Sequence, residues 1–217
     1  LLAMREKYEG IVNSAFAGEK RSQKALKDAF EDFMNADASC ARFLALYVDD
    51  LFRSRLRQLS DSDVEPELRR VIILFRYLQD KDVFEEFYKQ YLAKRLLGQR
   101  SLSDDAETKM VAMLKKECGY QFTSKLEGMF NDMTISRETA RQFKMRPEEG
   151  NAAMEFDCNV LTQGHWPFQP APLCRLPPTV QESCTTFERY NLQHLRRRPQ
   201  ARAERVELPD VHPDALQ

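Results

Sequence analysis

The sequence predicts a mainly α-helical protein, and three observations support that fold class. Charged residues make up 31% of the 217 residues, and only seven residues are glycine. Apolar residues recur three or four positions apart over most of the chain, which places them on one face of a helix. Alternation of apolar and polar residues, typical of a half-buried strand, occurs later, at 156–161. We therefore expect packed helices, then a small α/β part and a disordered tail.

The first 60 residues contain three helical patterns. Their apolar stripes are Met4, Tyr8, Ile11 and Val12, then Leu26, Ala29, Phe30 and Phe33, and then Phe43, Leu44, Tyr47 and Leu51. Each stripe predicts a helix that buries one face. Asp49 and Asp50 belong to the third pattern, and adjacent side chains on a helix point about 100° apart. That divergence favours a solvated helix face over a catalytic pair of carboxylates.

Two more helices are predicted between residues 61 and 98. Ser62 with Glu65, and Asp82 with Glu85, have the spacing of a capping box, in which both side chains bond to the backbone of the first turn. Gly98 then supplies a stop, because glycine accepts the left-handed conformation that ends many helices.

The next segments carry similar start and stop signals. Ser103 is an N-cap candidate, and Asp104 follows it where a carboxylate favours the positive end of the helix dipole. Gly119 is the next stop. Gly128 lies inside the following helix, where glycine costs about 1 kcal/mol relative to alanine, so we interpret it as a site of close helix–helix approach. A short separate helix is expected at 136–144.

These segments are expected to pack as a four-helix bundle. Its predicted core consists of the apolar residues on the inward faces, namely Val71, Leu74, Phe75, Leu78, Phe84, Phe87, Tyr88, Leu92, Val111, Leu114, Leu126, Met129, Phe130 and Met133. Basic residues on the same helices are interpreted as a solvated face, with recruitment of an acidic partner as the alternative: Lys94, Arg95, Lys115, Lys116 and Lys125.

The chain changes character after residue 146. Phe156, Cys158 and Val160 alternate with polar residues, so the pattern predicts a strand that ends before Pro167. Trp166, the only tryptophan, is interpreted as an anchor that pins the following turn onto the bundle. Contact with a partner protein is the alternative for this residue. One more helix is expected at 179–192.

Residues 195–217 contain no apolar period and are predicted to be disordered. A frameshift or a misread exon boundary would give such a tail. The functional alternative is a basic arm for nucleic acid or nuclear import. We favour disorder, because acidic residues dilute the positive charge of this segment.

No catalytic, metal or cofactor site is predicted, so we do not expect an enzyme. The five cysteines include no pair at C-x-x-C spacing, and the three histidines lie far from ligand-like partners. The glycine motifs that bind phosphate groups do not occur. Cys118, between Leu114 and Gly119, is interpreted as a buried thiol rather than a nucleophile.

Charge and hydropathy argue against two classes of partner. Acidic residues number 34 and basic residues 33, so no overall field favours nucleic acid or a membrane. No apolar run approaches the ~18 residues needed to span a bilayer. An odd number of widely spaced cysteines favours free thiols in a reducing compartment, and therefore a cytoplasmic or nuclear protein.

Three motifs resemble the cullin family: KDVFEEFYKQYLAKRLL at 81–97, SDDAE at 103–107 and ECGYQFTSKLEGMFNDM at 117–133. The last of these is long and close to diagnostic. FRYLQDKDVF together with FTSKLEGMF is most similar to the cullin-3 type, with the cullin-4 type a near second. Weaker matches extend the resemblance over residues 1–192.

The resemblance implies four parts. Residues 1–60 would be the end of the last N-terminal cullin repeat, 61–146 the helical bundle of the cullin homology domain, 147–194 the incomplete start of its α/β subdomain, and 195–217 a tail outside the family. In the family, a RING partner adds a strand to the sheet that begins after the bundle. The candidate RING-partner region here is therefore Phe156, Cys158, Val160, Leu161 and Trp166.

A member of this family would be a non-catalytic scaffold of a cullin-RING E3 ubiquitin ligase, acting in ubiquitin-dependent protein degradation by holding an adaptor and a RING partner apart. The resemblance implies a RING-box protein as partner, bound weakly or not at all by this segment. A BTB-type adaptor and the ubiquitin-like protein NEDD8 are partners of the full-length family member. The alternative is a stand-alone helical protein-interaction module, or a truncated product, without ligase assembly.

Overall fold

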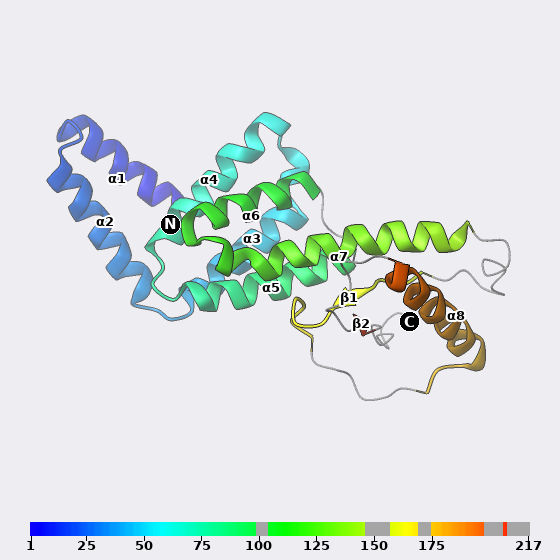
Figure 1. Cartoon of the computed structure of the whole chain (residues 1–217). Helices are drawn as coiled ribbons and strands as arrows, with labels where there is room; N and C mark the ends of the chain where they lie inside the picture. Colours follow the sequence, from blue (N-terminus) through cyan, green and yellow to red (C-terminus); the bar gives the residue numbers. More distant parts are fainter. Residues whose placement is uncertain (99–103, 146–156, 169–174, 198–205, 208–217) are drawn as a thin grey trace. The chain divides into compact units, whose positions relative to one another are not determined.

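The computed structural model describes residues 1–98, 104–145, 157–168, 175–197 and 206–207. These residues form eight α-helices, one 3-10 turn and two short strands (Figure 1). They divide into two compact units, Leu1–Thr123 and Ser124–Gln217. The mainly α-helical fold class is confirmed.

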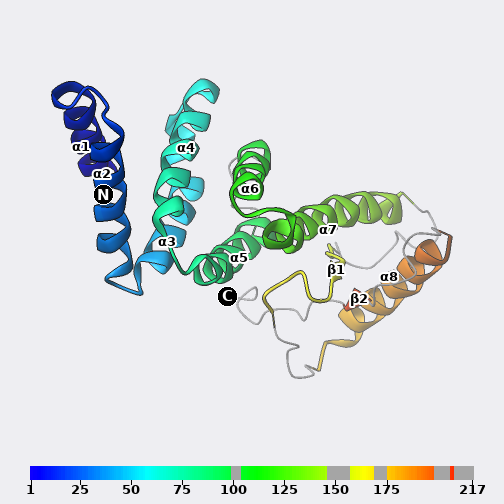
Figure 2. The same cartoon turned by 60° about the vertical axis from the view of Figure 1, so that its left-hand side comes forward.

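The described residues of the first unit form helices joined by short turns. It contains α1 (Leu2–Ala15), α2 (Lys20–Asn35), α3 (Cys40–Arg53), η1 (Arg55–Gln58), α4 (Asp61–Tyr77), α5 (Lys81–Leu97), α6 (Asp104–Cys118) and the first turn of α7 (Tyr120–Lys144). Helix α1 packs on α2, α2 on α4, and α4 on both α3 and α6, so neighbouring helices stack side by side (Figure 2). The most extensive contact joins α3 to α5, across the boundary expected at residue 60.

Aromatic rings fill the middle of this unit. The Phe75 ring meets the Phe84 ring edge-on at 5.0 Å between centroids, and the Phe122 ring at 6.0 Å. Aromatic pairs in this geometry contribute about 0.5–1.5 kcal/mol beyond the area that they bury. Of the fourteen residues predicted as bundle core, ten lie in this unit and four, on α7, in the second unit; all are buried except Phe87 and Phe130, which are half-buried.

The apolar stripe of α1 is less buried than its spacing predicts. Met4, Tyr8 and Ile11 are exposed, and Val12 is the buried residue of this helix. Two polar contacts join it to α4: Arg5 donates to the Tyr77 hydroxyl at 3.2 Å, and Arg70 donates to Glu6 at 2.7 Å.

Several helix ends differ from the predicted ends. Helix α4 begins two residues before the predicted start, because Ser60 rather than Ser62 is the N-cap: Ser60 adopts an extended conformation, and its carbonyl accepts the Asp63 amide. Asp80, rather than Asp82, occupies the N-cap position of α5. Gly98 does end α5, but with a φ of −78°, so the left-handed explanation was wrong there. It holds at Gly119, whose φ is +84°.

The second unit contains the rest of α7, then β1 (Leu161–Thr162), α8 (Pro178–Arg197) and β2 (Val206–Glu207). The two strands are antiparallel, with Leu161 opposite Glu207. The separate helix predicted from residue 136 is instead a continuation of α7, since neither glycine nor proline interrupts the chain there. The predicted helix at 179–192 is present as α8 and extends further.

The predicted strand at 156–161 is wrong in its extent, because β1 begins only at Leu161. The backbone of Val160 explains the difference. Its N–H and C=O both bond to the Ser136 hydroxyl, at 2.8 and 2.9 Å, so these groups pair with a side chain of α7 and not with a neighbouring strand. Phe156 lies outside the described residues.

The disorder predicted for 195–217 is wrong at two places. Residues 195–197 belong to α8, and Val206–Glu207 pairs with β1. The other residues of this tail lie outside the described part of the chain, as does the proposed N-cap Ser103. None of the described helices is both long enough and apolar enough to cross a bilayer.

Candidate functional site

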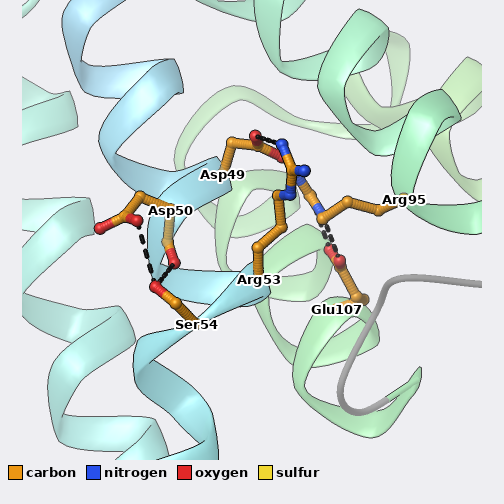
Figure 3. A network of polar contacts seen from close by, with 6 residues as sticks. All are labelled: Asp49, Asp50, Arg53, Ser54, Arg95 and Glu107. Carbon is orange, nitrogen blue, oxygen red and sulfur yellow. Dashed lines mark hydrogen bonds and ion pairs between the residues drawn. The ribbon is translucent and has the colours of Figure 1, made fainter.

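Helices α3, α5 and α6 are joined by a buried set of ion pairs (Figure 3). Arg95 of α5 donates from Nε and Nη2 to the two carboxylate oxygens of Glu107 on α6, at 2.6 and 3.0 Å. Its Nη1 donates to Oδ1 of Asp49 on α3 at 2.6 Å. Arg53 lies 3.4 Å from the other oxygen of Asp49. We call Arg95, Asp49 and Glu107 the Arg95 network.

This network is closed to water. Arg95 is 1% exposed, Glu107 is 0% exposed and Asp49 is 5% exposed. The rings of Phe52 and Tyr88 lie 5.0 and 5.8 Å from the guanidinium carbon, within the range of a cation–π interaction. The guanidinium therefore has anions in its hydrogen-bonding directions and aromatic rings beside it.

The titration of these groups favours a structural role. Burial disfavours the charged guanidinium, but the charge of Glu107 and the hydrogen bonds to Glu107 and Asp49 outweigh this effect, so the pKa of Arg95 lies above its ordinary value. Burial raises the pKa of Tyr88, and the charge of Glu107 adds to that effect. Both groups therefore keep their protons at physiological pH and do not suit acid–base catalysis.

The geometry also fixes how the helices meet. Removing one partner of a buried ion pair leaves an uncompensated charge, which costs ~3–5 kcal/mol. Paired N–H···O bonds between arginine and carboxylate are directional as well as strong. The network therefore holds α5 against α3 and α6 in one register, since sliding α5 would separate Arg95 from both carboxylates.

Two predictions are corrected by this network. Arg95 is not part of a solvated basic face, and Asp49 is not on a solvated acidic face. The spacing along α5 indicates that Arg95 is buried, because it lies seven residues after Tyr88 and three after Leu92, within the apolar stripe of this helix. The other basic residues of the predicted face, Lys94, Lys115, Lys116 and Lys125, are exposed as expected.

Glu107 was missed by the reasoning from sequence. Met110, Val111 and Leu114 follow it three, four and seven positions later, so it shares the buried face of α6. A carboxylate inside an apolar stripe requires a buried partner. The sequence alone does not say that Arg95 is this partner, because α6 and α5 meet only in the folded protein.

A second set of polar contacts attaches residues 157–168 to α7. Asp132 accepts hydrogen bonds from the Thr162 amide at 2.8 Å, the Thr162 hydroxyl at 2.7 Å and the Trp166 indole N–H at 2.7 Å. Asp132 and Trp166 are both buried. We call this group the Asp132 anchor. It supports the interpretation of Trp166 as an anchor for the turn.

Gly128 makes room for the same turn. A Cβ atom at this position would lie 2.4 Å from Nδ1 of His165, far inside van der Waals contact. The prediction of a close helix–helix approach at Gly128 was therefore wrong. The close neighbour is the imidazole of His165, which packs against α7 where that helix carries no side chain.

The candidate RING-partner residues are mostly inside the second unit. Val160, Leu161 and Trp166 are buried, and Cys158 is half-buried. Their backbone and side chains contact α7 through Ser136 and the Asp132 anchor. Binding of a partner at these residues stays a prediction.

The described residues give no sign of a reactive centre. No cluster of three or more histidine, cysteine or acidic side chains within them could hold a metal ion. Burial raises the pKa of Cys118, which makes this thiol a poor nucleophile at neutral pH. The arrangement is instead one of helices held by internal charge pairs.

Comparison with known proteins identifies the family to which this helical chain belongs. A family model described as the cullin alpha solenoid domain matches residues 1–140. The chain therefore belongs to the cullin family.

Individual relatives agree with the predicted cullin-3 type. The chain is 50% identical to Cullin-3A of Arabidopsis thaliana over 192 residues, which are 88% of this chain and 26% of the relative. It is 42% identical to Cullin-3 of Dictyostelium discoideum over 196 residues, or 89% of this chain and 26% of the relative. Cullin-4A of Mus musculus is 38% identical over 195 residues, 88% of this chain and 26% of the relative. The chain thus spans about a quarter of the length of these relatives.

Proposed function

We propose that this chain is a stiff, non-catalytic segment of a cullin scaffold in an E3 ubiquitin ligase. The observation that carries the proposal is the Arg95 network, in which one buried guanidinium holds three helices of the family's solenoid domain. A scaffold accelerates transfer by keeping a substrate close to the activated ubiquitin, which raises its effective concentration. That effect requires a spacer that does not bend, and buried, directional ion pairs resist bending.

The partners follow from the same proposal. An adaptor of the BTB type and a RING-box protein would bind the complete scaffold on either side of this segment. The segment by itself would bind a RING-box protein weakly, because residues 157–168 supply only one short strand, β1, toward the family's sheet. Binding of a RING-box protein to the isolated 217 residues with sub-micromolar affinity would contradict this part of the proposal.

A chimaera tests the scaffold role directly. The matching quarter of Arabidopsis Cullin-3A would be replaced by residues 1–192 of this chain, and ubiquitin transfer would be measured with a RING-box protein and a BTB adaptor. We expect the chimaera to support transfer and a version with a flexible glycine–serine segment in its place to fail. A folded chimaera that binds both partners but transfers no ubiquitin would contradict the proposal, as would an equally active flexible version.

A further inference from the structure

The backbone on either side of Leu161 in β1 is already hydrogen-bonded. The Val160 N–H and C=O both bond to the Ser136 hydroxyl of α7, at 2.8 and 2.9 Å. The Thr162 N–H donates to Asp132 of α7 at 2.8 Å, and its C=O accepts the His165 amide at 3.2 Å. Helix α7 therefore occupies one edge of this segment, through the backbone groups of residues 160 and 162.

Leu161 faces the opposite edge, where β2 lies. The two strands are antiparallel, with Glu207 opposite Leu161 and Val206 opposite Thr162. In such a ladder, pairs that exchange two backbone hydrogen bonds alternate with pairs that exchange none. Because the Thr162 backbone bonds elsewhere, Thr162 and Val206 are the pair without ladder bonds. Leu161 and Glu207 are therefore the hydrogen-bonded pair.

Strand β2 thus covers the backbone groups of β1 that could pair with a strand from elsewhere. Unpaired N–H and C=O groups at a strand edge are a template for an extended segment of another protein. Strand β2 belongs to residues 195–217, the tail that lies outside the resemblance to the family. The segment on this edge therefore comes from the part of the chain that no cullin motif reaches.

We propose that β2 blocks the Leu161 edge of β1, so that the chain's own tail excludes an extended segment of a partner protein from this edge. The pairing covers two residues of each strand, which leaves it open to displacement by a competing strand. The tail has an advantage over a free competitor, because attachment to the same chain raises its effective concentration. This inference does not depend on the scaffold function proposed above.

The test weakens β2 in the 217-residue chain and then offers the edge a free strand. Glu207→Pro removes the N–H that donates to the Leu161 carbonyl, so the ladder loses one hydrogen bond. Val206→Pro is the matched control, because the Val206 N–H makes no ladder bond and a strand tolerates proline at such a position. The free strand is a synthetic peptide of residues 201–212, ARAERVELPDVH, which contains β2.

Hydrogen exchange of the Leu161 amide, followed by NMR, is the measurement. In the wild type and in Val206→Pro we expect this amide to be protected, and the peptide to leave its signal unchanged. In Glu207→Pro it should exchange about two- to tenfold faster, the effect of one lost backbone hydrogen bond. Addition of the peptide to Glu207→Pro should restore the protection, and a peptide that itself carries Glu207→Pro should restore less.

Four outcomes would overturn the proposal. The Leu161 amide could exchange freely in the folded wild type, or equally fast in the two proline variants, which would place the effect outside this ladder. The peptide could bind the wild type as well as it binds Glu207→Pro, or restore no protection to that variant. Unchanged fluorescence of Trp166, which belongs to the Asp132 anchor, would show that each variant keeps its fold around β1.

Discussion

At Arg95, a single side chain satisfies two carboxylates that belong to two different helices. Mutation of the two arginines around Asp49 should therefore lower the free energy of unfolding by different amounts. Arg95 is buried and bonded at 2.6 Å, whereas the Arg53 side chain is 48% exposed and lies 3.4 Å from the same carboxylate. An exposed pair contributes up to about 1 kcal/mol, and a buried pair that loses one partner costs far more.

Arg95→Ala should therefore lower the free energy of unfolding by ~3–5 kcal/mol, because Asp49 and Glu107 would stay buried without their cation. Arg53→Ala, the matched control, should lower it by less than about 1 kcal/mol. Urea unfolding followed by circular dichroism would measure both changes. Similar losses for the two variants would show that the Arg95 network does not hold the helices.

Gly128 offers a second test at the scale of one residue. Gly128→Ala should destabilise the protein by ~1–3 kcal/mol, because the new methyl group would overlap the His165 ring. In a His165→Ala background the same change should become stabilising by up to about 1 kcal/mol, since alanine favours helix over glycine.

Gly10→Ala is the matched control, because Gly10 lies inside α1 and a Cβ there would meet nothing within 4 Å. It should be stabilising in both backgrounds. The free energies of unfolding of these variants, compared in a double-mutant cycle, would show whether Gly128 and His165 are coupled. An additive cycle would rule out the close approach.

At the scale of elements, spacing and stop residues locate the helices well. The apolar periods place α3 to α6, α8 is present where one more helix was expected, and Gly119 ends α6 with the expected positive φ. The extent of the strand was harder to predict. The backbone N–H of Val160 donates to the Ser136 hydroxyl, 24 residues away in the chain, and not to a neighbouring strand. Alternation describes which side chains face inward and does not say what the backbone bonds to.

We expect the Asp132 anchor to hold residues 157–168 on α7, so its removal should release them. Asp132→Ala would remove the acceptor of three hydrogen bonds, and each buried donor left unpaired costs about 1–3 kcal/mol. Trp166 is the only tryptophan, so its fluorescence reports directly on this turn. We expect the emission of the variant to shift to longer wavelength as the indole meets water.

Asp157→Ala is the control for this prediction, because the Asp157 side chain is 67% exposed and lies 3.7 Å from Lys144. Its emission should match that of the wild type. If Asp132→Ala kept the wild-type emission maximum, the indole would be held by packing alone, and the anchor would have no part in placing the turn.

For the whole molecule, the family, the helical class and most of the buried apolar residues follow from the sequence. The buried ion pairs of the Arg95 network do not follow from the sequence. Asp49 lies 46 residues before Arg95, which lies 12 residues before Glu107, and each is a charged residue of a kind usually found on a solvated surface. The apolar stripe around each residue shows that it is buried, but only the packing of α3, α5 and α6 shows how their charges combine.

We expect the Arg95 network to make α3, α5 and α6 one rigid body. Native-state hydrogen exchange of the backbone amides measures this most directly, because it reports the opening free energy of each helix separately. We predict that the slowest amides of α3, α5 and α6 exchange with one shared free energy, equal to that of global unfolding, and that Arg95→Ala lowers all three together. Opening of α5 or α6 alone, at a free energy well below that of global unfolding, would show that the Arg95 network does not join the three helices.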